Sequence, residues 1–200
     1  MPSIRLVALA LLTALPLAAQ TAATPNLGDK APEIALTSLD GQPLKLSTLL
    51  AQGDVALVFL RGYPGYQCPY CQKQVHAFVE DAPKFAARKI QILLVYPGET
   101  TTTQMSKDQT APPNTAPLDQ RGTEFLAKEG TLPPNIHFVL DPGFKVVTLY
   151  GLRWDAPHET AYPSTFLLNR RGVVLYRKIS HTHGDRATTE DILAAEPTKP

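Results

Sequence analysis

Two cysteines, Cys68 and Cys71, stand three positions apart in a Cys-Pro-Tyr-Cys sequence and are the only cysteines of the 200-residue chain. Two are too few for a disulfide scaffold or for a zinc site with four cysteine ligands. A pair with two intervening residues can cycle between dithiol and disulfide, because the second thiol can resolve a mixed disulfide formed at the first. The spacing therefore indicates redox chemistry. A structural disulfide and half of a metal site are the alternatives.

The flanking sequence predicts how this pair is positioned. Residues 55–60 form an uninterrupted apolar run, typical of a strand buried on both faces. A loop follows over residues 61–67, and apolar positions then recur at helical spacing over residues 75–79, so a helix should begin near Cys68. The unpaired amide groups and the dipole at a helix N-terminus favour a thiolate. Cys68 is therefore the expected nucleophile and Cys71 the resolving thiol.

A few further residues are candidates for the same face. Arg61 ends the buried strand and could favour the thiolate or hold an anionic oxygen, although a solvated strand end is the alternative. Trp154 could line this face, but a lone tryptophan is also a common core residue. Pro163 precedes a predicted strand, a place for either a cis-proline or an ordinary edge proline. His181 and His183 form a close pair to which we assign no role.

The remaining apolar periods predict one α/β domain. A right-handed parallel unit is expected where a second buried strand follows the helix, which Pro83 should kink or end. The other expected elements are a small hairpin over residues 34–36 and 44–46, strands over 90–96 and 136–140, a hairpin over 165–169 and 173–177, helices over 118–128, 144–150 and 188–195, and a surface insertion over 100–117.

The amino terminus resembles a secretory signal peptide. Arg5 precedes an apolar run over residues 6–17, and small residues follow at Ala18 and Ala19. The run is short for a membrane span of about 20 residues, so an uncleaved anchor is the weaker alternative. We predict a signal peptide over residues 1–19, a mobile leader over 20–28, a folded domain over 29–195 and a disordered tail over 196–200. The mature protein should be periplasmic or secreted, with no stable membrane insertion.

Composition and charge exclude several classes of partner. The formal net charge is +1, and the single charged residue of the first 25, Arg5, accounts for it. A neutral protein offers no basic field for nucleic acid or an anionic membrane. No Gly-x-Gly-x-x-Gly loop is present, so we expect no flavin or nicotinamide cofactor, and no metal is assigned. Electrons should then come from a thioredoxin-like donor.

Several phrases of the chain together resemble the alkyl hydroperoxide reductase and thiol-specific antioxidant family, specifically its peroxiredoxin-like branch. They are Gly28-Asp29-Lys30-Ala31-Pro32, Leu39-Asp40-Gly41, Arg61-Gly62, the Cys-Pro-Tyr-Cys box, Val95-Tyr96-Pro97-Gly98, Leu140-Asp141-Pro142 and Tyr162-Pro163-Ser164-Thr165-Phe166. The resemblance implies a thioredoxin-like fold, with a central mixed β-sheet flanked by helices and an N-terminal β-hairpin extension. It also implies that Cys68 and Cys71 form the redox centre. Pro163 resembles a cis-proline that binds substrate, with Tyr162 and Thr165 beside it.

One departure from the family pattern bears on the substrate. Peroxiredoxin loops resemble Pro-x-x-x-Thr/Ser-x-x-Cys, in which the hydroxyl positions the peroxide. Counted back from Cys71, Pro64 takes the proline position but Cys68 replaces the hydroxyl, and counting back from Cys68 matches neither position. We therefore expect an exported thiol-disulfide oxidoreductase or peroxiredoxin-like antioxidant that reduces disulfides or hydroperoxides, with Arg61 and Pro64 as supporting residues. The alternative is a copper metallochaperone using both thiolates and a histidine.

Overall fold

The computed structural model describes residues 23–38, 41–63, 66–97 and 131–197. The predicted signal peptide, the insertion over 100–117, the helix over 118–128 and Pro64 all lie outside these ranges. Among the described residues no helix is both long and apolar enough to cross a membrane.

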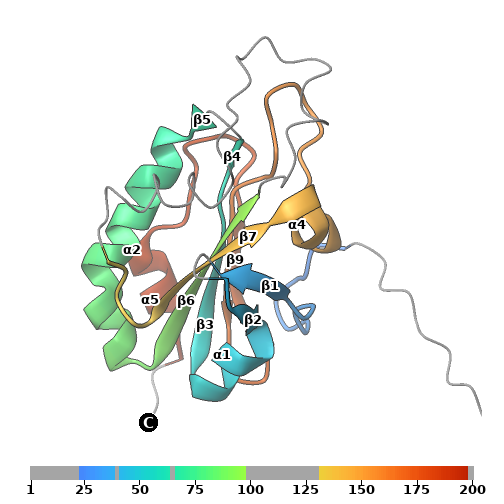
Figure 1. Ribbon diagram of the computed structural model, residues 1–200. Helices are drawn as coiled ribbons and strands as arrows, with labels where there is room; N and C mark the ends of the chain where they lie inside the picture. The colour runs from blue at the N-terminus through green and yellow to red at the C-terminus, as the bar shows by residue number, and fades with distance from the viewer. Residues whose placement is uncertain (1–22, 39–40, 64–65, 98–130, 198–200) are drawn as a thin grey trace, which may run out of the picture.

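A seven-stranded mixed sheet forms the centre of the molecule, in the order β2-β1-β7-β6-β3-β8-β9 (Figure 1). Its strands are β1 (Ala35–Ser38), β2 (Pro43–Lys45), β3 (Asp54–Phe59), β6 (Ile90–Pro97), β7 (Ile136–Asp141), β8 (Ser164–Leu168) and β9 (Val174–Ile179). Strand β6 pairs in parallel with β3 and with β7, and the other pairings are antiparallel. The expected thioredoxin-like α/β fold with a central mixed sheet is confirmed.

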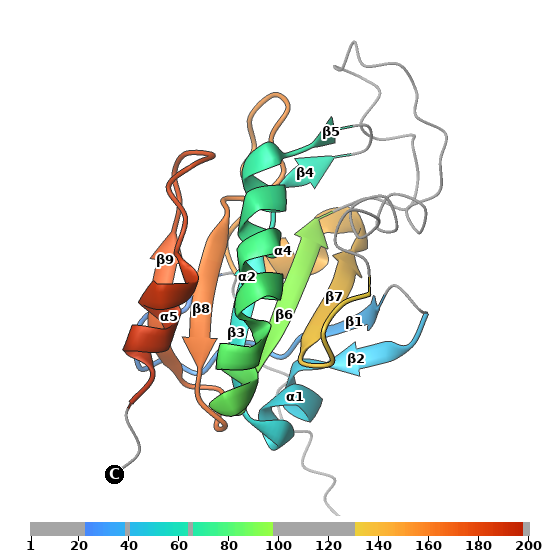
Figure 2. The same cartoon turned by 90° about the vertical axis from the view of Figure 1, so that its left-hand side faces the viewer.

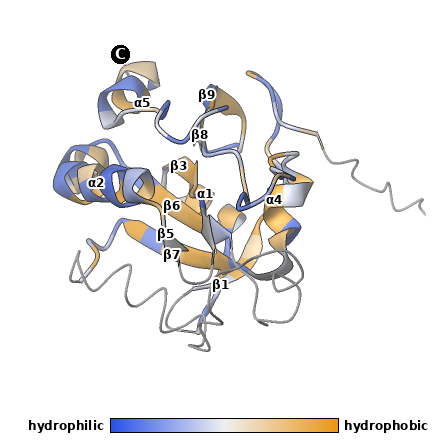
Figure 3. Ribbon diagram, turned by 90° about the horizontal axis from the view of Figure 1, so that it is seen from above, coloured by the Kyte–Doolittle hydropathy of each residue, from blue (hydrophilic) through white to orange (hydrophobic). Residues whose placement is uncertain are grey.

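Strand β3 illustrates how the sequence builds two cores. Successive side chains of this strand point to opposite faces of the sheet, so the neighbours Leu57 and Val58 belong to separate apolar clusters. Helices α1 (Leu46–Gln52) and α4 (Lys145–Leu149) cover one face, and α2 (Pro69–Ala87) and α5 (Thr189–Ala195) cover the other (Figure 2). Seen from above, the central strands are the most hydrophobic part of the chain (Figure 3). Burial on both faces explains the uninterrupted apolar run of this strand.

The N-terminal hairpin is present and joins the main sheet. Strand β1 pairs with β2 in the register Leu36 to Leu44, and its other edge pairs with β7. The residues just before it correct the expected mobile leader. The Thr24 hydroxyl donates to the Gly151 carbonyl at 3.3 Å, and the Gly28 amide donates to the Val174 carbonyl at 2.9 Å. Backbone bonding therefore extends the folded part of the chain upstream of residue 29.

Helix α2 continues past Pro83, so this proline does not end it. The helix runs on to Ala87. Beyond the proline, Phe85 is fully buried, and its ring centroid lies 5.6 Å from that of Phe78. A proline inside a helix removes its own amide donor and crowds the carbonyl of the preceding turn, and Pro83 lies at an exposed position of the helix. Packing of the last turn therefore offsets the lost hydrogen bond.

The C-terminal helix α5, which the sequence predicts over residues 188–195, begins with a capping box. The Thr188 hydroxyl accepts the Asp191 amide at 3.1 Å, and the Asp191 carboxylate accepts the Thr188 amide at 2.9 Å. After the helix, Glu196 forms an ion pair with Arg88 at 3.5 Å. The expected disordered tail therefore has its first residue paired with the residue that caps α2.

Candidate redox site

The two cysteines lie at the start of helix α2, which follows the central strand β3 along the chain after a short connection. A small hairpin of β4 (Gly62–Tyr63) and β5 (Tyr66–Gln67) fills the connection, which the sequence predicts as a loop. Cys68 is the N-cap of α2, and Cys71 lies one helical turn into it, at the upper end of the helix in Figure 1. The cysteines are 3.7 Å apart, and neither forms a disulfide in the structure. Both are almost fully buried.

The buried thiol of Cys71 is held by the backbone of Arg61. The Cys71 Sγ lies 2.9 Å from the Arg61 carbonyl oxygen and accepts the Arg61 amide at 3.1 Å. Desolvation by burial raises the pKa of Cys71 well above its usual value, and the hydrogen bond to Cys68 raises it further. This sulfur therefore stays protonated and serves as a hydrogen-bond donor.

Cys68 has the opposite acidity, although it has the same side chain. The hydrogen bond from the Cys71 thiol is the largest of the effects that lower the pKa of Cys68 to about 5, against the opposing effect of burial. The Cys71 amide and the guanidinium groups of Arg186 and Arg61 act in the same direction. Arg186 Nη2 lies 3.8 Å from the Cys68 Sγ. Cys68 is therefore a thiolate at neutral pH, and the arrangement favours it as the nucleophile.

Arg61 is buried beside the pair rather than solvated at the strand end. Its Nε donates to a Glu159 carboxylate oxygen, and its Nη2 donates to the His158 carbonyl at 3.0 Å. The other Glu159 oxygen is 2.8 Å from His183 Nε2. Burial would raise the pKa of Glu159, but the hydrogen bonds from Arg61 and His183 outweigh it and lower the pKa. Glu159 is thus the ionised partner of Arg61.

Arg186 is a site residue that the sequence analysis missed. Its Nε donates to the His183 carbonyl at 2.8 Å and its Nη1 donates to Gln74 Oε1, also at 2.8 Å. Arg186 comes from the segment between β9 and α5, far from the cysteines in sequence. No motif or periodicity marks it, because only the packing of α5 beside α2 brings this segment to Cys68.

Four ring side chains lie next to this network. The Trp154 and Tyr162 rings stack with centroids 4.7 Å apart and planes at 14°. The Trp154 centroid is also 5.6 Å from that of His183, and the Tyr162 centroid is 5.3 Å from that of His181. Through His183 and Glu159, this aromatic group contacts the residues that surround the cysteines. Trp154 therefore lies near the site, as the sequence analysis considered.

The proline loop differs from what the family resemblance implies. The described residues contain no cis peptide bond, so the bond before Pro163 is trans and the expected cis-proline is wrong. The Pro163 carbonyl accepts the Ser180 amide at 2.8 Å, which continues the antiparallel pairing of β8 with β9 beyond Ser164. Thr165 lies within β8 opposite Val58 and is 2% exposed. Of the three proposed substrate-binding residues, only Tyr162 is partly exposed.

Metal binding finds little support in the described part of the chain. No group of three or more His, Cys, Asp and Glu side chains there is placed to hold a metal ion. His183 faces Glu159 and Trp154, and His181 faces Tyr162. A copper ion at the cysteines would therefore have the two sulfurs as ligands, without the histidine that the alternative expects.

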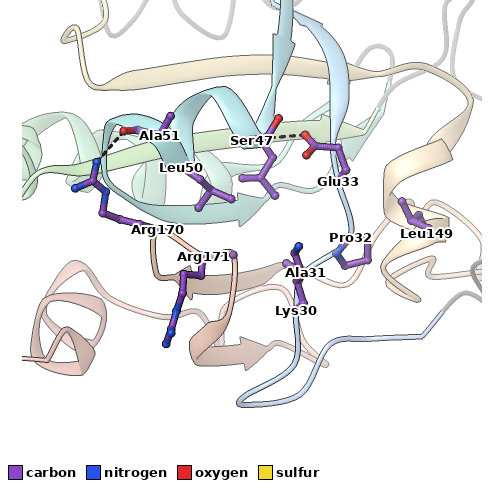
Figure 4. A pocket seen from close by; sticks show the side chains of 12 residues that line it. Lys30, Ala31, Pro32, Glu33, Ser47, Leu50, Ala51, Leu149, Arg170 and Arg171 are labelled. Atoms are coloured by element: carbon purple, nitrogen blue, oxygen red, sulfur yellow. Dashed lines mark hydrogen bonds between the residues drawn. The ribbon is translucent and has the colours of Figure 1, made fainter.

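Cavities open on the surface formed by the described residues. A groove of about 490 Å³ lies between α2 and the segment before α5, lined by residues that include Tyr70, Lys73 and Arg186. A larger cleft of about 830 Å³ lies at the opposite end of β3 from the cysteines. There, Glu33 accepts the Ser47 amide, and Arg170 donates to the Ala51 carbonyl (Figure 4). The groove shares Arg186 with the redox site.

Comparison with known proteins places this geometry in a family. The family model described as AhpC/TSA matches residues 27–177. No curated protein sequence matches the chain.

Solved structures share its fold at low sequence identity. The peroxidoxin BcpB from Mycobacterium tuberculosis is 21% identical with a TM-score of 0.63, over 86% of this chain and 96% of that one. A putative thiol:disulfide interchange protein DsbE from Chlorobium tepidum is 24% identical with a TM-score of 0.57, over 86% and 99%. The reduced 2-Cys peroxiredoxin of Plasmodium vivax is 13% identical with a TM-score of 0.57, over 84% and 92%.

Proposed function

Since the chain belongs to the AhpC/TSA family, and is therefore an oxidoreductase of thiol or peroxide substrates, we propose that it is an exported thiol-disulfide oxidoreductase using Cys68 and Cys71. One observation carries this proposal. Two thiols lie 3.7 Å apart at the start of α2, and the Arg186 guanidinium is 3.8 Å from the first of them. These surroundings lower the pKa of Cys68, whereas burial raises the pKa of Cys71. Such a pair has both a nucleophile at neutral pH and a protonated partner for the second step.

The proposed reaction transfers two electrons from the dithiol to a disulfide. The Cys68 thiolate attacks one substrate sulfur, a mixed disulfide forms, and the other substrate sulfur leaves as a thiolate. Cys71 then loses its proton to that leaving thiolate and attacks the Cys68 sulfur. The Cys68–Cys71 disulfide forms, and the first substrate sulfur leaves as a second thiolate. A thioredoxin-like donor would return the pair to the dithiol.

Hydroperoxides are the second substrate class. Attack of the Cys68 thiolate on the O–O bond would give a sulfenic acid and an alcohol, and Cys71 would condense with it to release water. Counted back from Cys68, the family pattern would place its hydroxyl residue at Gly65 and its proline at Arg61, so the sequence lacks the hydroxyl that positions peroxide beside this thiolate. Disulfide exchange is therefore the favoured activity of the site.

Two assays in parallel test the substrate class. Insulin reduction and hydroperoxide consumption are measured with dithiothreitol as the reductant. We expect faster insulin reduction than the dithiothreitol background and little peroxide turnover, with both lost in Cys68→Ser. In Cys71→Ser a mixed disulfide with substrate should accumulate and be visible by mass spectrometry. Insulin reduction that survives Cys68→Ser would disprove the assignment of the nucleophile.

Export has its own test. The full chain is expressed in a Gram-negative host, and the mature protein is analysed by mass spectrometry. Cleavage after Ala19 and recovery from the periplasm are expected. Retention of the uncleaved chain in the membrane fraction would favour an anchored protein instead.

A further inference from the structure

We propose that Arg186 is a catalytic residue of the redox centre, which stabilises the Cys68 thiolate from outside the region that the family model matches. This inference rests on the proposed function and names a residue that it requires. The match ends at residue 177, whereas Arg186 follows β9 in the segment leading to α5. Its Nη2 is 3.8 Å from the sulfur that would attack the substrate.

The two arginines near Cys68 differ in whether a carboxylate neutralises their positive charge. The Arg61 guanidinium is bonded to the Glu159 carboxylate, so its charge is compensated nearby. Arg186 has neutral partners, the Gln74 side chain and the His183 carbonyl, and within the described residues no carboxylate pairs with it. An uncompensated cation stabilises an adjacent thiolate more than one that already faces a carboxylate. Arg186 is therefore the main positive charge acting on Cys68.

Neighbouring contacts fix the segment that carries this arginine. Lys178 pairs with Asp185 at 2.6 Å, and His183 is held by Glu159. At the start of α5, the Thr189 hydroxyl donates to Asp81 of α2 at 2.5 Å. These contacts join the segment to β9, to the loop before β8 and to α2. The guanidinium thus has a defined position before any substrate arrives, which costs no reorganisation during the reaction.

Arg186 also lines the groove beside α2, together with Tyr70 and Lys73. Tyr70 is 51% exposed, and its ring lies against Gly184, where an added Cβ would be 3.1 Å from it. One guanidinium therefore contacts both the reacting sulfur and the surface from which a substrate can approach. It can stabilise the Cys68 thiolate before attack and the leaving substrate thiolate after it.

The test compares Arg186→Gln with Arg186→Lys and with a control, Arg171→Gln, on the reduced full protein. Arg171 is exposed in the turn between β8 and β9, at the end of the sheet away from the cysteines. In Arg186→Gln, alkylation of Cys68 by iodoacetamide at about pH 4 should slow roughly tenfold, and the midpoint of the thiolate's ultraviolet absorbance should rise. Arg186→Lys should recover most of the rate, and Arg171→Gln should match the wild type.

The emission of Trp154, the single tryptophan, reports whether the segment keeps its place, because its ring lies close to His183. Unchanged alkylation and an unchanged midpoint in Arg186→Gln, with unchanged emission, would overturn the inference. If Arg186→Gln alters the emission of Trp154, the alkylation rate of Cys68 in Arg186→Lys becomes the test. An alkylation rate in the lysine variant as slow as that in the glutamine variant would overturn the inference. A wild-type protein that neither alkylates below neutral pH nor reduces insulin would instead refute the proposed function.

Discussion

At the scale of single residues, the two cysteines show how one side chain acquires two acidities. Cys71 is buried against the Arg61 backbone and keeps its proton, whereas Cys68 receives hydrogen bonds and positive charge. The difference does not come from the Cys-Pro-Tyr-Cys sequence alone, because both thiols share it. It comes from the direction of the hydrogen bond between them, from the deeper desolvation of Cys71 and from the arginines beside Cys68.

This direction predicts the effect of replacing the second cysteine. In Cys71→Ala the thiol donor is lost, so the pKa of Cys68 should rise from about 5. Cys71→Ser keeps a hydroxyl donor and should retain a lower pKa than the alanine variant. The pH dependence of Cys68 alkylation measures both. Equal midpoints in the alanine and serine variants would contradict the role given to this hydrogen bond.

At the scale of elements, the seven-residue helix α5 helps to set the position of Arg186. Its capping box orders the chain just after Arg186, and Ile192 packs into the same apolar cluster as helix α2. A short helix has little stability of its own, so its cap and its packing hold it in place. The position of Arg186 therefore depends on the start of α5.

Removing the cap should be measurable. Thr188→Ala loses the hydroxyl that accepts the Asp191 amide, so the free energy of unfolding should fall by about 1 kcal/mol. Thr148→Ala, at an exposed position of α4, is the matched control and should cost little. Urea denaturation gives both values. If the two variants lose equal stability, the cap is not what stabilises the helix.

At the scale of the whole molecule, ionisation of Cys68 links the redox state of the cysteine pair to the free energy of unfolding. The pKa of Cys68 is lowered from 9.0 to about 5 in the folded protein, so the unfolded chain binds a proton that the folded one does not. The resulting stabilisation is fully present above about pH 9 and is lost as the pH falls through about 5. The same effect favours the reduced form over the disulfide.

The reduced protein should therefore gain stability between about pH 5 and about pH 9 relative to Cys68→Ala, which has no titrating thiol at this position. The melting temperature of both proteins across this range, in the presence of a reductant, measures the difference. A reduction potential above that of thioredoxin, about −270 mV, should accompany it. A constant difference in melting temperature across the range would argue against a thiolate in the folded state.

Much of the fold could be predicted from patterns of apolar residues. The run over residues 55–60 predicted the central strand, and the turn around Asp40-Gly41 predicted the hairpin of β1 and β2. Local rules failed where packing overrides them. Pro83 would end an isolated helix, but Phe85 is buried beyond it. Pro163 resembles a cis-proline in its sequence context, yet the bond before it is trans.

For the site, the sequence by itself determined the chemistry: two thiols at redox spacing, placed at the start of a helix after a buried strand. These features depend on neighbours along the chain, so a local pattern carries them. Only the tertiary structure decided which charges surround the pair. Arg61, Glu159, His183 and Arg186 come from separate segments, and their contacts exist only after the sheet has brought the ends of β3, β8 and β9 together. The acidity of Cys68 is for this reason a property of the folded molecule.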